Sequence, residues 1–146
     1  ILVKTSNKSS GQLQDLVTQD CRSIYEIMAA YVNEWGKNVR GKYGYSSVGA
    51  VVGATYPNQA KLLRSIMKHA YILVPGYGAQ GGTAKDCAHS FNKDGLGAIV
   101  NASRSVMCAY MSEHWKDQYS EDSFAEAARA EVIRMKNDLN SALEQR

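Results

Sequence analysis

The chain has 146 residues, of which 45% are hydrophobic and 21% charged, and its formal net charge is +3. This is the size and composition of one globular domain. No apolar run approaches the ~20 residues needed to cross a bilayer, and charges of both signs are mixed along the chain rather than gathered into a basic stripe. We therefore expect neither a membrane nor a nucleic acid as partner.

The cysteines, Cys21, Cys87 and Cys108, are odd in number and widely spaced, with no CxxC pair and no histidine at ligand spacing. This pattern predicts reduced, buried thiols in a cytoplasmic protein, and no metal site. The first residues, Ile1–Val3, already form an apolar run, with no initiating Met and no secretory signal before them. A chain that starts inside a strand looks like one piece of a longer protein.

The first predicted unit covers about residues 1–34. Its strand is the apolar run Ile1–Val3, followed by the polar segment Lys4–Gly11. Apolar residues then recur every three to four positions between Leu13 and Tyr31, which predicts a helix. The second unit, about 47–68, opens with the run Val48–Val52.

After this second strand, Pro57 fits the first turn of a helix. The third unit, about 71–93, has the strand Tyr71–Val74, the loop Pro75–Gly82 and a helix opened by Thr83 or Asp86. Each unit so far repeats the order of strand, turn and helix, which is typical of a parallel sheet.

The fourth unit, about 97–116, has the strand Ala98–Val100, with Ser103 as N-cap of a helix Arg104–Trp115. A last amphipathic helix is predicted at about 121–145, packed on its own fold rather than reserved for a partner. The strands show almost no polar alternation, which suits a sheet covered on both faces. Together these units predict an α/β architecture.

The loop Pro75–Gly82 contains four glycines, which let the backbone turn sharply and approach a ligand closely. A second polar turn, Asn101–Arg104, follows the next strand. Because ligands bind at the carboxyl ends of parallel strands, we expect these turns to form a phosphate-binding site. Its candidate donors are the backbone amides of Gly81, Gly82, Ser103 and Arg104 and the guanidinium of Arg104. The alternative is that these residues bind no ligand: the glycines would then only form a tight turn, and Arg104 would be a surface salt-bridge partner.

Four motifs carry a resemblance to a known family, and they occur in order over nearly the whole chain. They are Lys4-Thr-Ser-Asn7, Val52-Gly-Ala-Thr55, Pro75-Gly-Tyr-Gly-Ala-Gln-Gly-Gly82 and Asn101-Ala-Ser-Arg-Ser105. They resemble the last four strand-end motifs of orotidine 5'-phosphate decarboxylase, in the longer bacterial subgroup of that family. The glycine loop followed by the Ser-Arg-Ser turn is the specific part of the match.

The resemblance implies a (β/α)8 TIM barrel in which residues 1–146 supply strands five to eight, their helices and a C-terminal helix. They would form the C-terminal half of a single domain, and the N-terminal half would come from another segment or chain. The implied activity converts orotidine 5'-monophosphate to uridine 5'-monophosphate in de novo pyrimidine biosynthesis, without metal or cofactor, in a cytoplasmic homodimer. Without its neighbours, the half-barrel would keep unpaired apolar edges and be poorly soluble.

The resemblance also implies roles for single residues. The Ser6 hydroxyl would contact the pyrimidine edge, and the Gln80 amide would bridge the base and the 5'-phosphate. Arg104 would hold the phosphate. Leu2 and Pro75 would line the apolar side of the pocket near the reacting carbon.

One departure concerns the family's catalytic Asp-x-Lys-x-x-Asp motif, which lies in the first half of the barrel. None of the seven aspartates of this chain has a lysine two positions on, so we expect no catalytic residue here. Two alternatives stay open: a non-catalytic module that binds a phosphorylated ligand, and another phosphate-binding barrel enzyme such as a pentulose-phosphate epimerase. The Ser6 loop beside Gln80 argues against the second of these, since the pair suits a pyrimidine better than a sugar.

Overall fold

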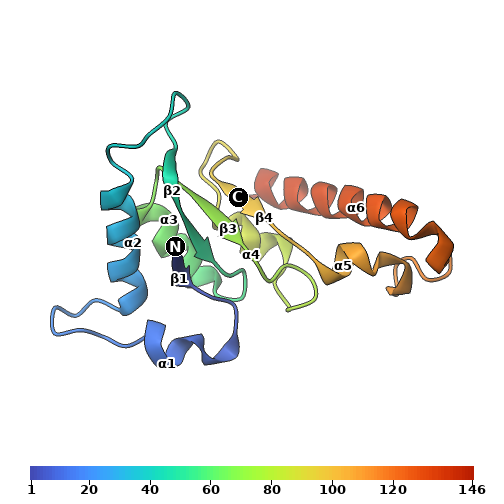
Figure 1. Cartoon of the computed structure of the whole chain (residues 1–146), viewed down its shortest axis with the longest axis horizontal. Coiled ribbons are helices and arrows are strands. Elements are labelled where there is room, and N and C mark those ends of the chain that lie inside the picture. Colours follow the sequence, from blue (N-terminus) through green and yellow to red (C-terminus); the bar gives the residue numbers. More distant parts are fainter.

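The computed structural model describes all 146 residues and contains one sheet of four parallel strands (Figure 1). The strands are β1 (Leu2–Lys4), β2 (Ser46–Val52), β3 (Ala70–Val74) and β4 (Ala98–Val100). They lie side by side in chain order, with β1 and β4 at the edges. The predicted α/β class with a parallel sheet is therefore confirmed.

Helices follow each strand, and their first residues explain where they begin. The helices are α1 (Gly11–Gln14), α2 (Ile24–Trp35), α3 (Pro57–Ile66), α4 (Ala84–Ala88), α5 (Arg104–Met107) and α6 (Phe124–Glu144), with 3-10 turns at Lys8–Ser10, Ala109–Met111 and Glu121–Ser123. A capping box of Ser23 and Glu26 opens α2, and a second one, of Thr83 and Asp86, opens α4. Pro57 stands in the first turn of α3, as predicted.

The helices cover only one face of the sheet. Along β3, Ala70, Ile72 and Val74 are buried beneath them, whereas Tyr71 and Leu73 are each 41% exposed. Leu2 on β1 and Ile99 on β4 are exposed as well, and all four of these exposed side chains are apolar or aromatic. The expectation of a sheet covered on both faces is therefore wrong for this chain, because no helix covers the second face and only the Tyr45 ring packs there, against Tyr71.

The single helix predicted between Leu13 and Tyr31 is also wrong. It is split into α1 and α2 by a turn in which the Thr18 side chain and backbone amide both donate to the Arg22 carbonyl, at 2.9 Å each. Local hydrogen bonds of this kind give the backbone an alternative to the helix ladder. Cys21, in the same turn, has a positive φ of 62°, which no helix tolerates.

The helix predicted from Arg104 to Trp115 ends at Met107 instead. The chain then turns through the 3-10 segment Ala109–Met111, which brings the fully buried Ala109 against α6. The long helix α6 packs on α4 and α5, with Met135 and Ala142 buried. In Figure 1, α5 and the first half of α6 extend away from the sheet.

The cysteines form no disulfide, and burial differs among them. Cys87 is buried, which raises the pKa of its thiol to about 12, but Cys21 and Cys108 are exposed. The prediction of buried thiols is therefore wrong for the latter two. No helix is both long and apolar enough to cross a membrane.

Candidate functional site

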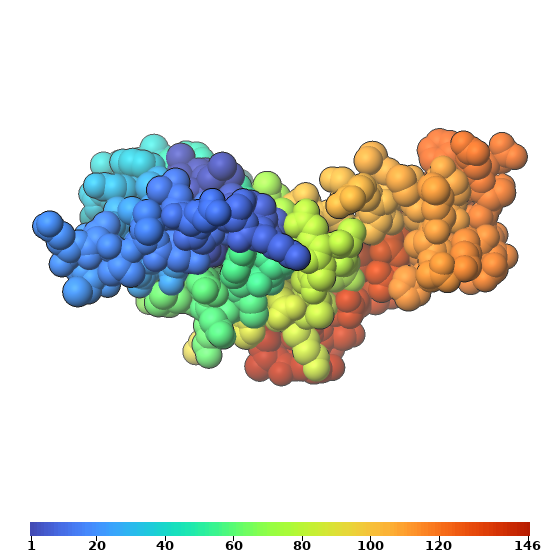
Figure 2. Space-filling view, turned by 90° about the horizontal axis from the view of Figure 1, so that it is seen from below, coloured from blue at the N-terminus to red at the C-terminus, as the bar shows by residue number.

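The loops that follow β1 and β3 meet at the carboxyl edge of the sheet, which is where parallel α/β folds place ligands. Figure 2 shows the blue segment after β1 touching the yellow-green segment after β3. Gly76 sits between them with a φ of 101°, a backbone conformation that glycine adopts readily. A Cβ at this position would lie 3.4 Å from Gln80 Oε1 and 3.4 Å from Ser6 Cβ. Ser6 and Gln80 are thus brought together around one glycine.

A small cavity lies beside this contact, between the glycine loop and the turn after β4. Its volume is about 80 Å³, and Pro75, Gln80, Ser103 and Arg104 are among the residues that line it. Liquid water occupies roughly 30 Å³ per molecule, so the cavity has room for a phosphate-sized group. Binding pockets for small organic molecules usually measure ~300–1,000 Å³. A larger ligand held here by one end would therefore extend over the edge of the sheet.

The polar side chains around this cavity are free to bind a ligand. The Arg104 guanidinium, the Gln80 amide and the Ser6 hydroxyl make no hydrogen bond or ion pair within the chain, although most polar groups near them are paired. The backbone amides of Ser103 and Arg104 also donate to no acceptor, as expected at the start of a helix. The cavity is therefore lined by unused donors, which suits an anion.

Two of the predicted backbone donors are not available. The amide of Gly81 donates to the Gly78 carbonyl at 2.8 Å, and that of Gly82 donates to the Gly76 carbonyl at 3.0 Å. In this conformation the loop uses both amides to close its own turn, so their donation to a phosphate stays a prediction. Leu2 lies outside the cavity, on the bare face of the sheet, where it is 63% exposed.

The glycine loop is tied to the last helix by one buried side chain. Tyr77 is 5% exposed, and its hydroxyl donates to Asp138 Oδ2 of α6 at 2.7 Å. Burial, together with this carboxylate, raises the pKa of Tyr77 to about 12. A groove of about 480 Å³ opens beside Tyr77. Tyr77 and Arg134 are already paired there, with Asp138 and Glu131, and no residue of the turn after β4 lines this groove, so we do not place the functional site there.

Two contacts that support the site were not foreseen. The Thr55 hydroxyl, after β2, donates to the Ser6 carbonyl at 3.3 Å. A Cβ on Gly53 would lie 2.8 Å from the Cα of Ser6, so only glycine allows the two backbones to come this close. The Val-Gly-Ala-Thr motif contained the signal, since a glycine directly after a buried strand often marks a close approach of another backbone.

No family model matches this chain. A decarboxylase of Clostridium perfringens, named orotidine 5'-phosphate decarboxylase, is 43% identical over 98% of this chain and 48% of its own length. The enzyme of the same name from Rhodopirellula baltica is 45% identical over 95% of this chain and 46% of its own length.

Among solved structures, OMP decarboxylase of Leishmania donovani matches with a TM-score of 0.71 and 29% identity. The match covers 97% of this chain and 46% of that one. The chain thus spans about half the length of the curated relatives it matches. Its sheet and helices correspond to about half of a decarboxylase TIM barrel. Over nearly its whole length, this chain is therefore similar to about half of an orotidine 5'-phosphate decarboxylase.

Proposed function

We propose that the complete protein converts orotidine 5'-monophosphate to uridine 5'-monophosphate in de novo pyrimidine biosynthesis, and that this chain supplies the phosphate and pyrimidine contacts. The position of Gln80 carries the proposal. Its side chain lines the phosphate-sized cavity and also approaches Ser6 across Gly76. One amide can therefore reach both ends of a nucleotide that is anchored by its phosphate.

Each remaining role suits the group that fills it. The Arg104 guanidinium offers planar, paired donors that match the oxygens of a phosphate dianion. Ser103 and Arg104 add their free backbone amides at the same cavity. The Ser6 hydroxyl can donate to or accept from an edge of the pyrimidine. Pro75 lines the cavity with an apolar surface, and Leu2 offers a second one on the open face of the sheet.

We infer that the catalytic lysine and aspartates lie in the other half of the barrel, because no Asp-x-Lys-x-x-Asp motif occurs here. This chain would supply strands five to eight, and the N-terminal half would pair with the edge strands β1 and β4. It would also cover Tyr71, Leu73 and Ile99 on the bare face. The family resemblance further implies a cytoplasmic homodimer.

Phosphate binding contributes to rate as well as to affinity in this proposal. Contacts to a part of the substrate that does not react can drive loop closure and be used to stabilise the transition state. The glycine loop is suited to such a closure. It carries Gln80, and the buried Tyr77 side chain, with its hydrogen bond to Asp138, anchors it to α6.

A comparison of two ligands tests the proposal in the complete protein. Isothermal titration calorimetry should detect uridine 5'-monophosphate, while uridine, which lacks the phosphate, should bind at least about 100-fold more weakly, since it forfeits several charge-assisted hydrogen bonds. Equal affinities for the two ligands would contradict a phosphate site at the cavity. Binding of phosphate and ribose 5-phosphate, but no gain from the pyrimidine, would favour a sugar phosphate as the ligand.

A further inference from the structure

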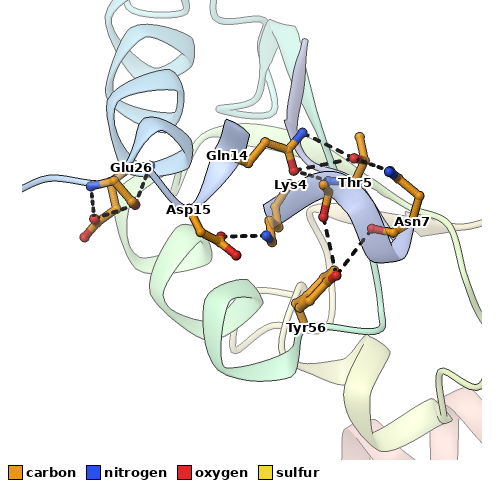
Figure 3. Close-up of polar contacts among 9 residues, drawn as sticks. Lys4, Thr5, Asn7, Gln14, Asp15, Glu26 and Tyr56 are labelled. Atoms are coloured by element: carbon orange, nitrogen blue, oxygen red, sulfur yellow. Dashed lines mark hydrogen bonds and ion pairs between the residues drawn. The ribbon is translucent and has the colours of Figure 1, made fainter. Parts of the chain in front are cut away.

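Lys4, the last residue of β1, is a fully buried lysine. Its side chain has 0% of its surface exposed, and lysine is almost never buried to this extent unless its charge is paired. The pairing register of β1 with β2 shifts between Leu2 and Lys4. The side chain of Lys4 then points into the layer of helices, toward Asp15 (Figure 3), rather than onto the bare face where Leu2 lies.

Three groups surround the Lys4 ammonium. Asp15, directly after α1, accepts a hydrogen bond from Lys4 Nζ at 2.6 Å. The ring of Tyr56, from the turn between β2 and α3, has its centroid 4.3 Å from Nζ, and the ring of Tyr25 on α2 lies at 5.8 Å. Aromatic faces at these distances attract a cation, most strongly where water is excluded. The ammonium therefore joins the end of β1 to three other segments.

The same cluster reaches the chain on the far side of Ser6. The Tyr56 hydroxyl donates to the Asn7 carbonyl at 3.3 Å and accepts from the Ser10 hydroxyl at 3.4 Å (Figure 3). Ser6 itself is thus flanked by Lys4 two residues before it and by the tethered Asn7 directly after it. Asp15 contacts Lys4, Lys4 contacts Tyr56, and Tyr56 contacts Asn7, so these contacts connect the two sides of the Ser6 loop.

Further bonds hold the base of this loop. The Thr5 amide donates to Gln14 Oε1 at 3.0 Å, and the Thr5 hydroxyl donates to Asn7 Oδ1 at 2.7 Å. The Ser6 hydroxyl is the exception, because it makes no hydrogen bond with the chain while its neighbours are all engaged. The loop is built so that one hydroxyl stays free at a defined place.

We propose that Lys4 is a positioning residue, which fixes the Ser6 hydroxyl for recognition of the pyrimidine by holding Asp15 and Tyr56 on either side of its ammonium. The inference rests on the proposed function, since it assigns the base end of the nucleotide to Ser6. The unbranched apolar side chain of methionine, one atom shorter, would fill most of the space but would lose the attraction of the ammonium to the carboxylate and to the ring face. The Ser6 loop would then keep its packing but lose the contacts of the Lys4 ammonium with Asp15 and Tyr56.

The test is the ratio of two affinities in the complete protein carrying Lys4→Met, measured by calorimetry with uridine 5'-monophosphate and with ribose 5-phosphate. The nucleotide uses Ser6, whereas ribose 5-phosphate uses only the phosphate cavity. We expect the variant to bind uridine 5'-monophosphate about tenfold more weakly, the effect of one lost hydrogen bond to the base. Ribose 5-phosphate should bind within about twofold of the unmodified protein, as for a site left intact.

Lys8→Met is the matched control, because Lys8 lies on the same loop, is exposed and makes no ion pair; it should change neither affinity. If Lys4→Met does not fold, the same two affinities are measured for Tyr56→Phe. This variant keeps the ring beside Lys4 and removes only the hydroxyl that holds Asn7. It should weaken binding of the nucleotide alone, by about threefold.

Equal losses for both ligands, or no loss for either, in the variant that folds would overturn the positioning role. Turnover of orotidine 5'-monophosphate by the unmodified protein is measured separately. A shifted ratio without turnover would support the role of Lys4 and contradict the proposed activity, so the two failures are distinguishable.

Discussion

Replacing Arg104 by alanine in the complete protein is expected to weaken binding of uridine 5'-monophosphate by about 2–3 kcal/mol, or roughly 30- to 140-fold. The guanidinium lines the phosphate-sized cavity and has no polar partner within the chain, so its removal breaks no internal hydrogen bond or ion pair. The lost interaction is a charge-assisted hydrogen bond to a dianion, among the stronger kinds in proteins. Calorimetry with the nucleotide measures the loss, and kcat/KM for decarboxylation should fall with it.

Arg129→Ala provides the matched control, because Arg129 is an exposed arginine on α6 that also makes no ion pair. Its removal should leave the affinity within about twofold of that of the unmodified protein. Uridine, which has no phosphate, should bind the Arg104 variant as it binds the unmodified protein. Unchanged nucleotide affinity on loss of Arg104 would remove this residue from the site.

Replacing Gly53 by alanine is expected to lower the free energy of unfolding by about 1–3 kcal/mol, the usual cost of forcing a methyl group into a packed place. The new Cβ would lie 2.8 Å from the N, Cα and Cβ atoms of Ser6. Since the N and Cα atoms belong to backbone, they cannot rotate away as the end of a side chain can. The variant should also bind uridine 5'-monophosphate more weakly, because relief of the clash displaces Ser6.

Gly41→Ala introduces the same methyl group where there is room. Its Cβ would meet only the Tyr45 carbonyl, at 3.8 Å, and Gly41 lies in an exposed turn without a positive φ. Urea unfolding of both variants therefore separates the clash from the general effect of replacing glycine. Equal midpoints for the two would show that Ser6 and Gly53 are not held as closely as described.

The strands could be predicted because a buried parallel strand needs an uninterrupted apolar run, as in Tyr71–Val74 and Val48–Val52. The breaks in the helices could not be predicted in this way. Between Leu13 and Tyr31 the apolar spacing continues through a turn that is closed by the Thr18 hydroxyl and the Arg22 carbonyl. Periodicity records which residues are apolar, whereas this turn depends on a local hydrogen bond that leaves no mark on the period.

The residues of the site could be named from four motifs, since each motif follows an apolar run and the ends of parallel strands share one edge. Which groups are free could not be read from the motifs. The amides of Gly81 and Gly82 are used inside the loop, and this depends on the turn that four glycines happen to adopt. The burial of Lys4 was missed for a similar reason. A lysine after a strand is usually exposed, and only the shifted register of β1 turns it inward.

The bare face of the sheet has a simple physical explanation in the proposed half-barrel. Strands that read as buried on both sides are built for a closed barrel, in which the inner face is covered by the opposite strands. Here Leu73 and Ile99 keep that apolar character without a cover, and Tyr71 is covered only in part, by the ring of Tyr45. The strands have the apolar sequence of strands buried on both faces, but in residues 1–146 alone one face is exposed.

The most direct test of the central claim is the rate at which orotidine 5'-monophosphate loses its carboxylate, followed by ultraviolet absorbance. It should be measured for residues 1–146 alone and for a polypeptide in which the other half of the barrel precedes them. We expect decarboxylation by the longer polypeptide and none by residues 1–146, which hold the phosphate and pyrimidine contacts but no catalytic lysine. Decarboxylation by residues 1–146 alone, or none by the longer polypeptide, would contradict this division of the active site.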